Sequence, residues 1–106
     1  MNIVDKIKEQ INGNAIVLYM KGNPTFPACG FSAQTVQNLQ NCNEKFAYID
    51  ILQDDEIRQG IKDFSDWPTI PQVYVNGEFI GGCDIVNDMA QSGELAELIS
   101  TTITRK

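Results

Sequence analysis

The chain has 106 residues, of which 42% are hydrophobic and 21% are charged, and this is enough apolar material for one domain, residues 1–106, with a single core. Fourteen acidic residues against eight basic ones give a formal net charge of -6, which argues against nucleic acid as a partner because most of the surface would repel phosphates. The sequence contains no histidine, and this excludes histidine-dependent triads, general bases and metal sites within the chain.

The first half of the chain predicts a helix followed by a strand, a helix and a second strand. Asn2 is a favourable N-cap for the first helix, whose apolar residues follow helical spacing until Gly13 ends it. The apolar run AIVLYM at 15–20 predicts a central strand buried on both faces, and FAYIDI at 46–51 predicts the next strand. Helical spacing returns between them at Phe31, Val36 and Leu39. A strand, a helix and a strand in succession form a right-handed unit, so the two strands should be parallel.

The following segment predicts a short helix and then a β-hairpin. Residues 54–64 place acidic side chains at the positive end of a helix and two isoleucines on one face, although Gly60 is unfavourable in a helix interior. In QVYVNGEFI, Asn76 and Gly77 accept the positive φ angles of a type I′ turn. The segments on either side of this turn should therefore form an antiparallel pair.

The remaining residues predict two helices and complete the fold. Gly81 and Gly82 break the second hairpin strand, helical character resumes at 83–90, and a terminal helix follows with its N-cap near Ser92. The resulting order is α-β-α-β-α-β-β-α-α. This order predicts an α/β protein with a thioredoxin-like arrangement, in which helices flank a four-stranded mixed sheet with a parallel half and a hairpin half.

Cys29 lies where the chemistry of such a fold is expected. It follows the loop after the first strand, at the carboxyl edge of the sheet, and it precedes a predicted helix. The helix dipole, free backbone N–H groups and the charge of Lys21 would all favour the thiolate, so we predict a reactive cysteine rather than a buried inert one. A Cys-x-x-Cys redox pair is absent, because the fourth position of the motif is Ser32. Ser32 either caps or packs within the first helical turn.

The other cysteines indicate a reducing compartment. Three cysteines at wide, irregular spacing fit neither a disulfide framework nor a zinc site. Cys42, at the far end of the same helix, is expected to be a packing or an exposed structural cysteine. Cys83 in GGCD either binds an anion through its backbone or approaches Cys29 with its thiol. The N-terminal segment lacks a signal or transit pattern and no run is long enough to span a membrane, so the expected location is cytoplasmic. A processed organellar form fits the sequence equally well.

Two sequence segments and one lysine together make the chain resemble a known family. They are CGFS at Cys29–Ser32, Lys21 upstream of it, and WPTIPQVYVNGEFIGGCD at 67–84. The chain resembles the monothiol glutaredoxins of the CGFS type, in particular the single-domain bacterial and organellar members. The resemblance runs from about Val4 to Ile99.

The resemblance implies a glutathione site built around a cis proline at Pro71, which faces the active cysteine. Lys21 and Arg58 would meet glutathione carboxylates, with Lys62 a weaker candidate for the same role. The backbone of Ile70 would pair with the tripeptide. The γ-glutamyl end would be bound by the start of the following helix, and Trp67 would support the loop. The two residues at that helix start are Cys83 and Asp84.

The resemblance also implies that the chain carries an iron-sulfur cluster. A 2Fe-2S cluster held by sulfur needs four thiolates. Cys29 supplies one, so two chains and two glutathione molecules would complete a bridged homodimer. Members of the family act as carriers between iron-sulfur donor and acceptor proteins, often with a BolA-type partner.

The sequence is also compatible with two other functions. The first is a glutathione-dependent thiol-disulfide oxidoreductase in which Cys29 attacks a protein-glutathione mixed disulfide. The inserted NPTFP before Cys29 argues against it, because it resembles the loop of poorly active members. A Cys29–Cys83 disulfide is a further option for such chemistry. The second is a redox-inert adaptor that acts through protein contacts alone.

Overall fold

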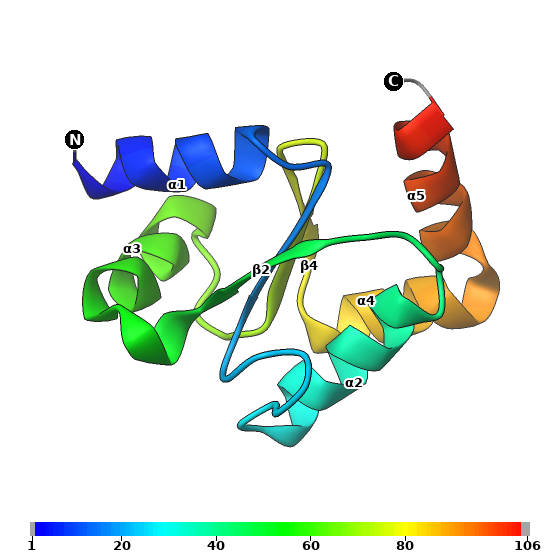
Figure 1. The fold of residues 1–106 in the computed structure, drawn as a ribbon, viewed down its shortest axis with the longest axis horizontal. Coiled ribbons are helices and arrows are strands. Elements are labelled where there is room, and N and C mark those ends of the chain that lie inside the picture. Colours follow the sequence, from blue (N-terminus) through cyan, green and yellow to red (C-terminus); the bar gives the residue numbers. More distant parts are fainter. Residues whose placement is uncertain (1, 105–106) are drawn as a thin grey trace.

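The structure is a computed structural model that describes residues 2–104. Its order of helices and strands is the predicted one with a short 3-10 segment, η1, added after the second strand (Figure 1). The elements are α1 (Ile3–Asn12), β1 (Ile16–Met20), α2 (Gly30–Gln40), β2 (Ala47–Asp50), η1 (Ile51–Gln53), α3 (Asp55–Ser65), β3 (Gln72–Val75), β4 (Glu78–Gly81), α4 (Cys83–Ser92) and α5 (Glu94–Thr104).

The four strands form one mixed sheet in the order β2-β1-β3-β4. β1 pairs with β2 in parallel and with β3 antiparallel, and β3 pairs antiparallel with β4. The predicted fold class, with its parallel half and its hairpin half, is therefore confirmed. Helices α1 and α3 lie on one side of the sheet, and α2, α4 and α5 lie on the other (Figure 1).

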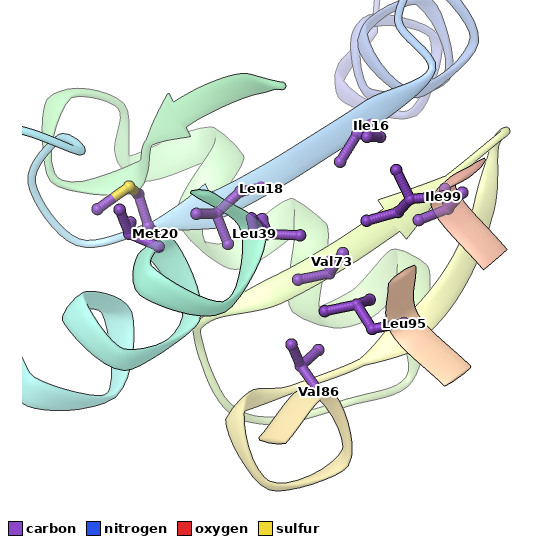
Figure 2. Close-up of a cluster of buried hydrophobic side chains, with 10 residues drawn as sticks. Ile16, Leu18, Met20, Leu39, Val73, Val86, Leu95 and Ile99 are labelled. Carbon is purple, nitrogen blue, oxygen red and sulfur yellow. The ribbon is translucent and has the colours of Figure 1, made fainter. Parts of the chain in front are cut away.

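The burial of β1 on both of its faces explains the continuous apolar run at 15–20. Every residue of β1 is buried. Ile16, Leu18 and Met20 belong to the core beneath α2, α4 and α5, shown in Figure 2. Val17 and Tyr19 belong to the second core, beneath α1 and α3. A strand with helices on both faces cannot alternate apolar and polar residues, and this is why the predicted central strand is correct.

Local signals define the helix starts and the hairpin turn as expected. Asn2 Oδ1 accepts the backbone N–H of Asp5 at 2.9 Å and so caps α1. Asn76 and Gly77 both have positive φ, 54° and 82°, as a type I′ turn requires. Packing explains the glycine at position 60 of α3, because an added Cβ would lie 2.8 Å from Ile3 Cγ1 where α1 crosses α3.

Some boundaries and exposures differ from the sequence-based predictions. Phe31 is 65% exposed, so it does not belong to the buried face of α2. β2 ends at Asp50, whose side chain accepts the backbone N–H of Leu52 and turns the chain into η1. β4 includes Gly81 rather than breaking before it. Ser92 Oγ accepts the N–H of Glu94 at 3.3 Å, so the expected cap near Ser92 is present.

Within residues 2–104, no helix is both long and apolar enough to cross a bilayer.

Candidate functional site

The loop between β1 and α2 carries Cys29 and is held by a hydrogen bond within the loop and by another to the end of β2. Ala28 N donates to Lys21 O at 2.8 Å, and Gly22 N donates to Asp50 Oδ1 at 3.0 Å. Gly22 has a φ of 85°, and an added Cβ would lie 2.6 Å from Phe26 O, so only glycine fits at this crossing. The loop therefore delivers Cys29 to a defined position at the carboxyl end of β1.

Cys29 is the N-cap of α2, as the sequence predicted. Its Sγ accepts the backbone N–H of Ser32 at 3.3 Å and lies 3.2 Å from Ser32 Oγ. Ser32 is fully buried, and its Oγ accepts the backbone N–H of Lys21 at 3.1 Å. Because that N–H occupies the acceptor side of the hydroxyl, the hydroxyl proton is available to the sulfur when Cys29 loses its own proton. Ser32 thus does more than fill the position of a second cysteine.

These contacts favour the thiolate form of Cys29. Partial burial raises the pKa of the Cys29 thiol, but several opposing effects outweigh it, so the pKa lies below its ordinary value. Those effects are the hydrogen bonds from the Ser32 side chain and backbone, the positive charge of Lys21, and the N–H of Phe31. The direction agrees with the expectation for a cysteine at a helix N-terminus.

An open cavity of about 400 Å³ lies against the first turn of α2, and Cys29 itself is not among the residues that line it. Its walls come from the end of β1, the first turn of α2, the last part of α3, the loop Trp67–Pro71 and the first turn of α4. Lys21 and Phe31 line the cavity, and both are tied to Cys29 through the first turn of α2, where Ser32 contacts the backbone of Lys21 and the sulfur of Cys29. The volume falls in the range of small-molecule sites, and the location at the carboxyl edge of the parallel strands is the usual one for ligands in open α/β sheets.

The charges around the cavity are arranged for a ligand with both anionic and cationic groups. Lys21 and Lys62 line it, while Asp84 lies in the first turn of α4. The N-cap of α4 is Gly82, which offers no side-chain oxygen to the free N–H groups of that turn. Those N–H groups and the helix dipole are therefore available to an anionic group of a ligand.

Arg58 does not join the other predicted site residues. It is exposed on α3, one turn before Lys62, and it is not part of the cavity wall. Lys62, expected to be the weaker candidate, is the basic residue of this helix that lines the cavity. Ile70, Cys83 and Asp84 line the cavity as the resemblance implied. The Ile70–Pro71 peptide bond is cis, which confirms the expectation that the resemblance gave.

Cys83 and Cys42 have different surroundings from Cys29. Cys83 Sγ accepts a hydrogen bond from Asn87 Nδ2 at 3.6 Å, and Asn87 Oδ1 accepts one from Asn38 of α2. This polar connection between α2 and α4 could not be identified from the sequence. Cys42 packs against the core and burial raises the pKa of its thiol, which agrees with a packing role. All three cysteines are free thiols.

The described part of the chain contains no metal-binding group of its own. Among residues 2–104, no cluster of three or more cysteine, aspartate or glutamate side chains is placed to hold a metal ion.

Known proteins similar to this chain are glutaredoxins. The glutaredoxin family model matches residues 16–80. The chain is 52% identical over 105 residues to Glutaredoxin 4 of Haemophilus ducreyi, covering 99% of this chain and 98% of that protein. It is 54% identical over 102 residues to Glutaredoxin 4 of Escherichia coli strain K12, covering 96% and 89%.

Solved structures show the same likeness. The solution structure of reduced poplar apo GrxS14 matches with a TM-score of 0.83 and 41% identity over 96% of this chain and 94% of that one. A buckwheat glutaredoxin-glutathione complex matches with a TM-score of 0.83, covering 94% of this chain and 89% of that one. Its identity is 22%, so this second match supports the fold alone.

Proposed function

Because this chain belongs to the glutaredoxin family, as a monothiol member, we propose that it binds glutathione in the cavity beside Cys29 and shares a 2Fe-2S cluster with a second copy. In this proposal the cluster is cargo. The protein receives it from an iron-sulfur donor and passes it to an acceptor, so its main role is that of a carrier and not of an enzyme.

The observation that carries the proposal is a cysteine whose surroundings favour the thiolate, at the start of the same helix turn whose Phe31 lines a cavity of about 400 Å³. The cavity offers complementary groups for each part of glutathione. Lys21 and Lys62 suit a carboxylate, and the backbone of Ile70 suits the peptide groups. The free N–H groups at the start of α4 suit the γ-glutamyl carboxylate, while Asp84 suits its ammonium group.

The thiol content of the chain supports a shared cluster. A 2Fe-2S cluster bound by sulfur needs four thiolates, and Cys29 is the thiol of this chain whose surroundings favour that form. Two copies of Cys29 and two glutathione thiolates make four. Because half of these ligands would be small molecules, the cluster should leave readily, which suits transfer to another protein. A BolA-type protein could replace the second copy, and we place the whole process in the cytoplasm.

Native mass spectrometry after anaerobic reconstitution tests this proposal. The expected species contains two chains, two glutathione molecules and one 2Fe-2S cluster. Cys29→Ser should remain a monomer without iron, whereas Cys42→Ser, the matched control for loss of a thiol, should assemble like the parent protein. A cluster that assembles without glutathione, or on Cys29→Ser, would rule the proposal out.

The lowered pKa of Cys29 also supports a second function, glutathione-dependent reduction of mixed disulfides. The Cys29 thiolate would attack the glutathione sulfur of a protein-glutathione disulfide, form a Cys29–glutathione disulfide and release the protein thiolate. A second glutathione thiolate would then attack the same adduct, giving glutathione disulfide and free Cys29. A colourless monomer that turns over a glutathionylated protein would favour this function over the carrier.

A further inference from the structure

One buried polar side chain beneath the cavity is explained neither by the fold nor by the proposed ligand contacts. Gln72, the first residue of β3, is fully buried. Its Nε2 donates to the carbonyl oxygens of Trp67 and Thr69, at 3.2 Å each, and its Oε1 accepts the hydroxyl of Tyr74 at 3.1 Å. Both amide N–H groups and the amide oxygen are thus in use.

These bonds hold the inner side of the loop Trp67–Pro71. The loop has no regular secondary structure, so its carbonyl groups need partners from elsewhere. Gln72 supplies partners for two of them from below. The side chains of Trp67 and Thr69 remain exposed on the outer side and line the cavity. The Gln72 side chain therefore bonds to the backbone of the loop without lining the cavity where a ligand would lie.

Tyr74 fixes the orientation of the Gln72 amide. A tyrosine hydroxyl is already protonated at neutral pH and burial raises the pKa of Tyr74 further, to about 12, so the phenol is a hydrogen-bond donor here. Because it donates to Oε1, the opposite end of the amide, Nε2, must face the loop. The Tyr74 ring also lies 5.4 Å from the Phe79 ring, which lies 6.0 Å from the Trp67 ring. The amide and this row of aromatic rings support the same loop.

We infer that Gln72 is a positioning residue for the glutathione site, holding the backbone of the Trp67–Pro71 loop at the height that the ligand needs beside Cys29. It is not part of the cavity wall, so it would act through the loop and not by contact with the ligand. The inference rests on the proposed function, because it assumes that glutathione is the ligand of this cavity.

The test compares two reagents at the same thiol. In the first reaction the Cys29 thiolate attacks one sulfur of glutathione disulfide, forms the Cys29–glutathione disulfide and releases a glutathione thiolate. In the second reaction iodoacetamide alkylates Cys29, and this small reagent does not have to bind against the loop Trp67–Pro71. Rates are followed by mass spectrometry that assigns the modified residue. A loop shift that misplaces a bound reactant slows only the first reaction.

For Gln72→Met, which keeps the length of the side chain but removes its hydrogen bonds, we expect the rate with glutathione disulfide to fall about tenfold. The rate with iodoacetamide should stay within about twofold, because the contacts of the Cys29 thiolate do not involve the loop. Gln40→Met, an exposed position at the end of α2, is the matched control and should leave both rates unchanged.

Tyr74→Phe provides a second test that does not depend on the folding of Gln72→Met. It keeps the ring and removes the hydroxyl, which orients the amide and also hydrogen-bonds the Ser65 side chain, so we expect about a threefold loss with glutathione disulfide alone. Unchanged rates in every folded variant would overturn the inference. Equal slowing with both reagents would also overturn it, since that result indicates a merely structural role.

A failure of the proposed function has a different signature. If the parent protein reacts with glutathione disulfide no faster than with the small 2-hydroxyethyl disulfide, the cavity gives glutathione no advantage and both proposals fall. If the parent protein prefers glutathione disulfide and the Gln72 and Tyr74 variants keep that preference, only the role of Gln72 is wrong.

Discussion

The two loop-to-helix junctions that border the cavity each carry a cysteine, but they use the helix N-terminus differently. At α2, Cys29 is the N-cap and its sulfur accepts the N–H of Ser32. At α4, Gly82 is the N-cap, and Cys83 Sγ accepts a hydrogen bond from Asn87 instead. At the first junction a backbone N–H is used by the chain's own sulfur, whereas at the second no side chain caps the helix. In the proposed function, this difference of one residue along the helix makes the first cysteine a nucleophile and leaves the second junction to bind the ligand.

The largest expected difference between the junctions is in their reaction with glutathione disulfide. Cys29→Ser should abolish the glutathione adduct, whereas Cys83→Ser should keep it, because the helix N-cap position, Ser32 and Lys21 all favour the thiolate of Cys29. Mass spectrometry of the intact protein after exposure to glutathione disulfide measures the adduct. An adduct that persists in Cys29→Ser and maps to Cys83 would contradict the comparison.

The second largest expected effect at the α2 junction is that of removing the Ser32 hydroxyl. Ser32→Ala removes a donor to the thiolate and should raise the pKa of Cys29, so that the thiolate forms only at higher pH. Alkylation at neutral pH should slow by about tenfold, the size expected for one hydrogen bond to a charged group.

The check for Ser32→Ala is the pH profile of iodoacetamide alkylation, with Cys42 alkylation in the same sample as the internal control. The midpoint for Cys29 should move to higher pH while that for Cys42 stays in place. A profile that does not move would assign Ser32 to packing alone.

The two basic residues of α3 offer a smaller, paired test of the binding side. Lys62→Gln should weaken glutathione binding by about fivefold, because Lys62 lines the cavity and a charge-assisted contact would be lost. Arg58→Gln, one turn earlier and exposed, is the matched variant and should have less effect. Titration calorimetry at two salt concentrations measures both. A larger loss for Arg58→Gln would contradict this expectation and support the role that the family resemblance implied for Arg58.

The smallest expected effect concerns the glycine that precedes α4. An added Cβ at Gly82 would lie 3.2 Å from Pro71 O and 3.4 Å from Trp67 Nε1, so Gly82→Ala should push the loop outward by a few tenths of an ångström. We expect about threefold weaker glutathione binding. Gly30→Ala, at the start of α2, is the matched control because its Cβ would meet nothing within 4 Å. Equal affinity for both variants would show that the loop tolerates the shift.

The sequence predicted those features whose causes are local. The run AIVLYM at 15–20 is apolar on both faces because β1 lies between two helical layers, and Asn76-Gly77 specifies its turn through backbone conformation. Cys29 was found in the same way, since a cysteine before a helical pattern implies free N–H groups next to its sulfur.

The features that the sequence could not predict depend on contacts between distant segments. Phe31 follows the helical period but faces solvent, because the first turn of α2 projects beyond the core at the edge of the cavity. Lys62 lines the cavity and Arg58 does not, and this difference depends on the rotation of α3 against the sheet. Gln72 looks like an ordinary strand residue until the loop Trp67–Pro71 is placed above it.

The most direct test of the central claim is an amide NMR comparison of the free protein with the Cys29–glutathione disulfide. If the thiolate of one junction and the free N–H groups of the other serve one ligand, the largest shift changes will include Ile70, Cys83 and Asp84 as well as the first turn of α2. Changes confined to Cys29 and its neighbours in α2 would mean that glutathione does not occupy the cavity, and the account would be wrong.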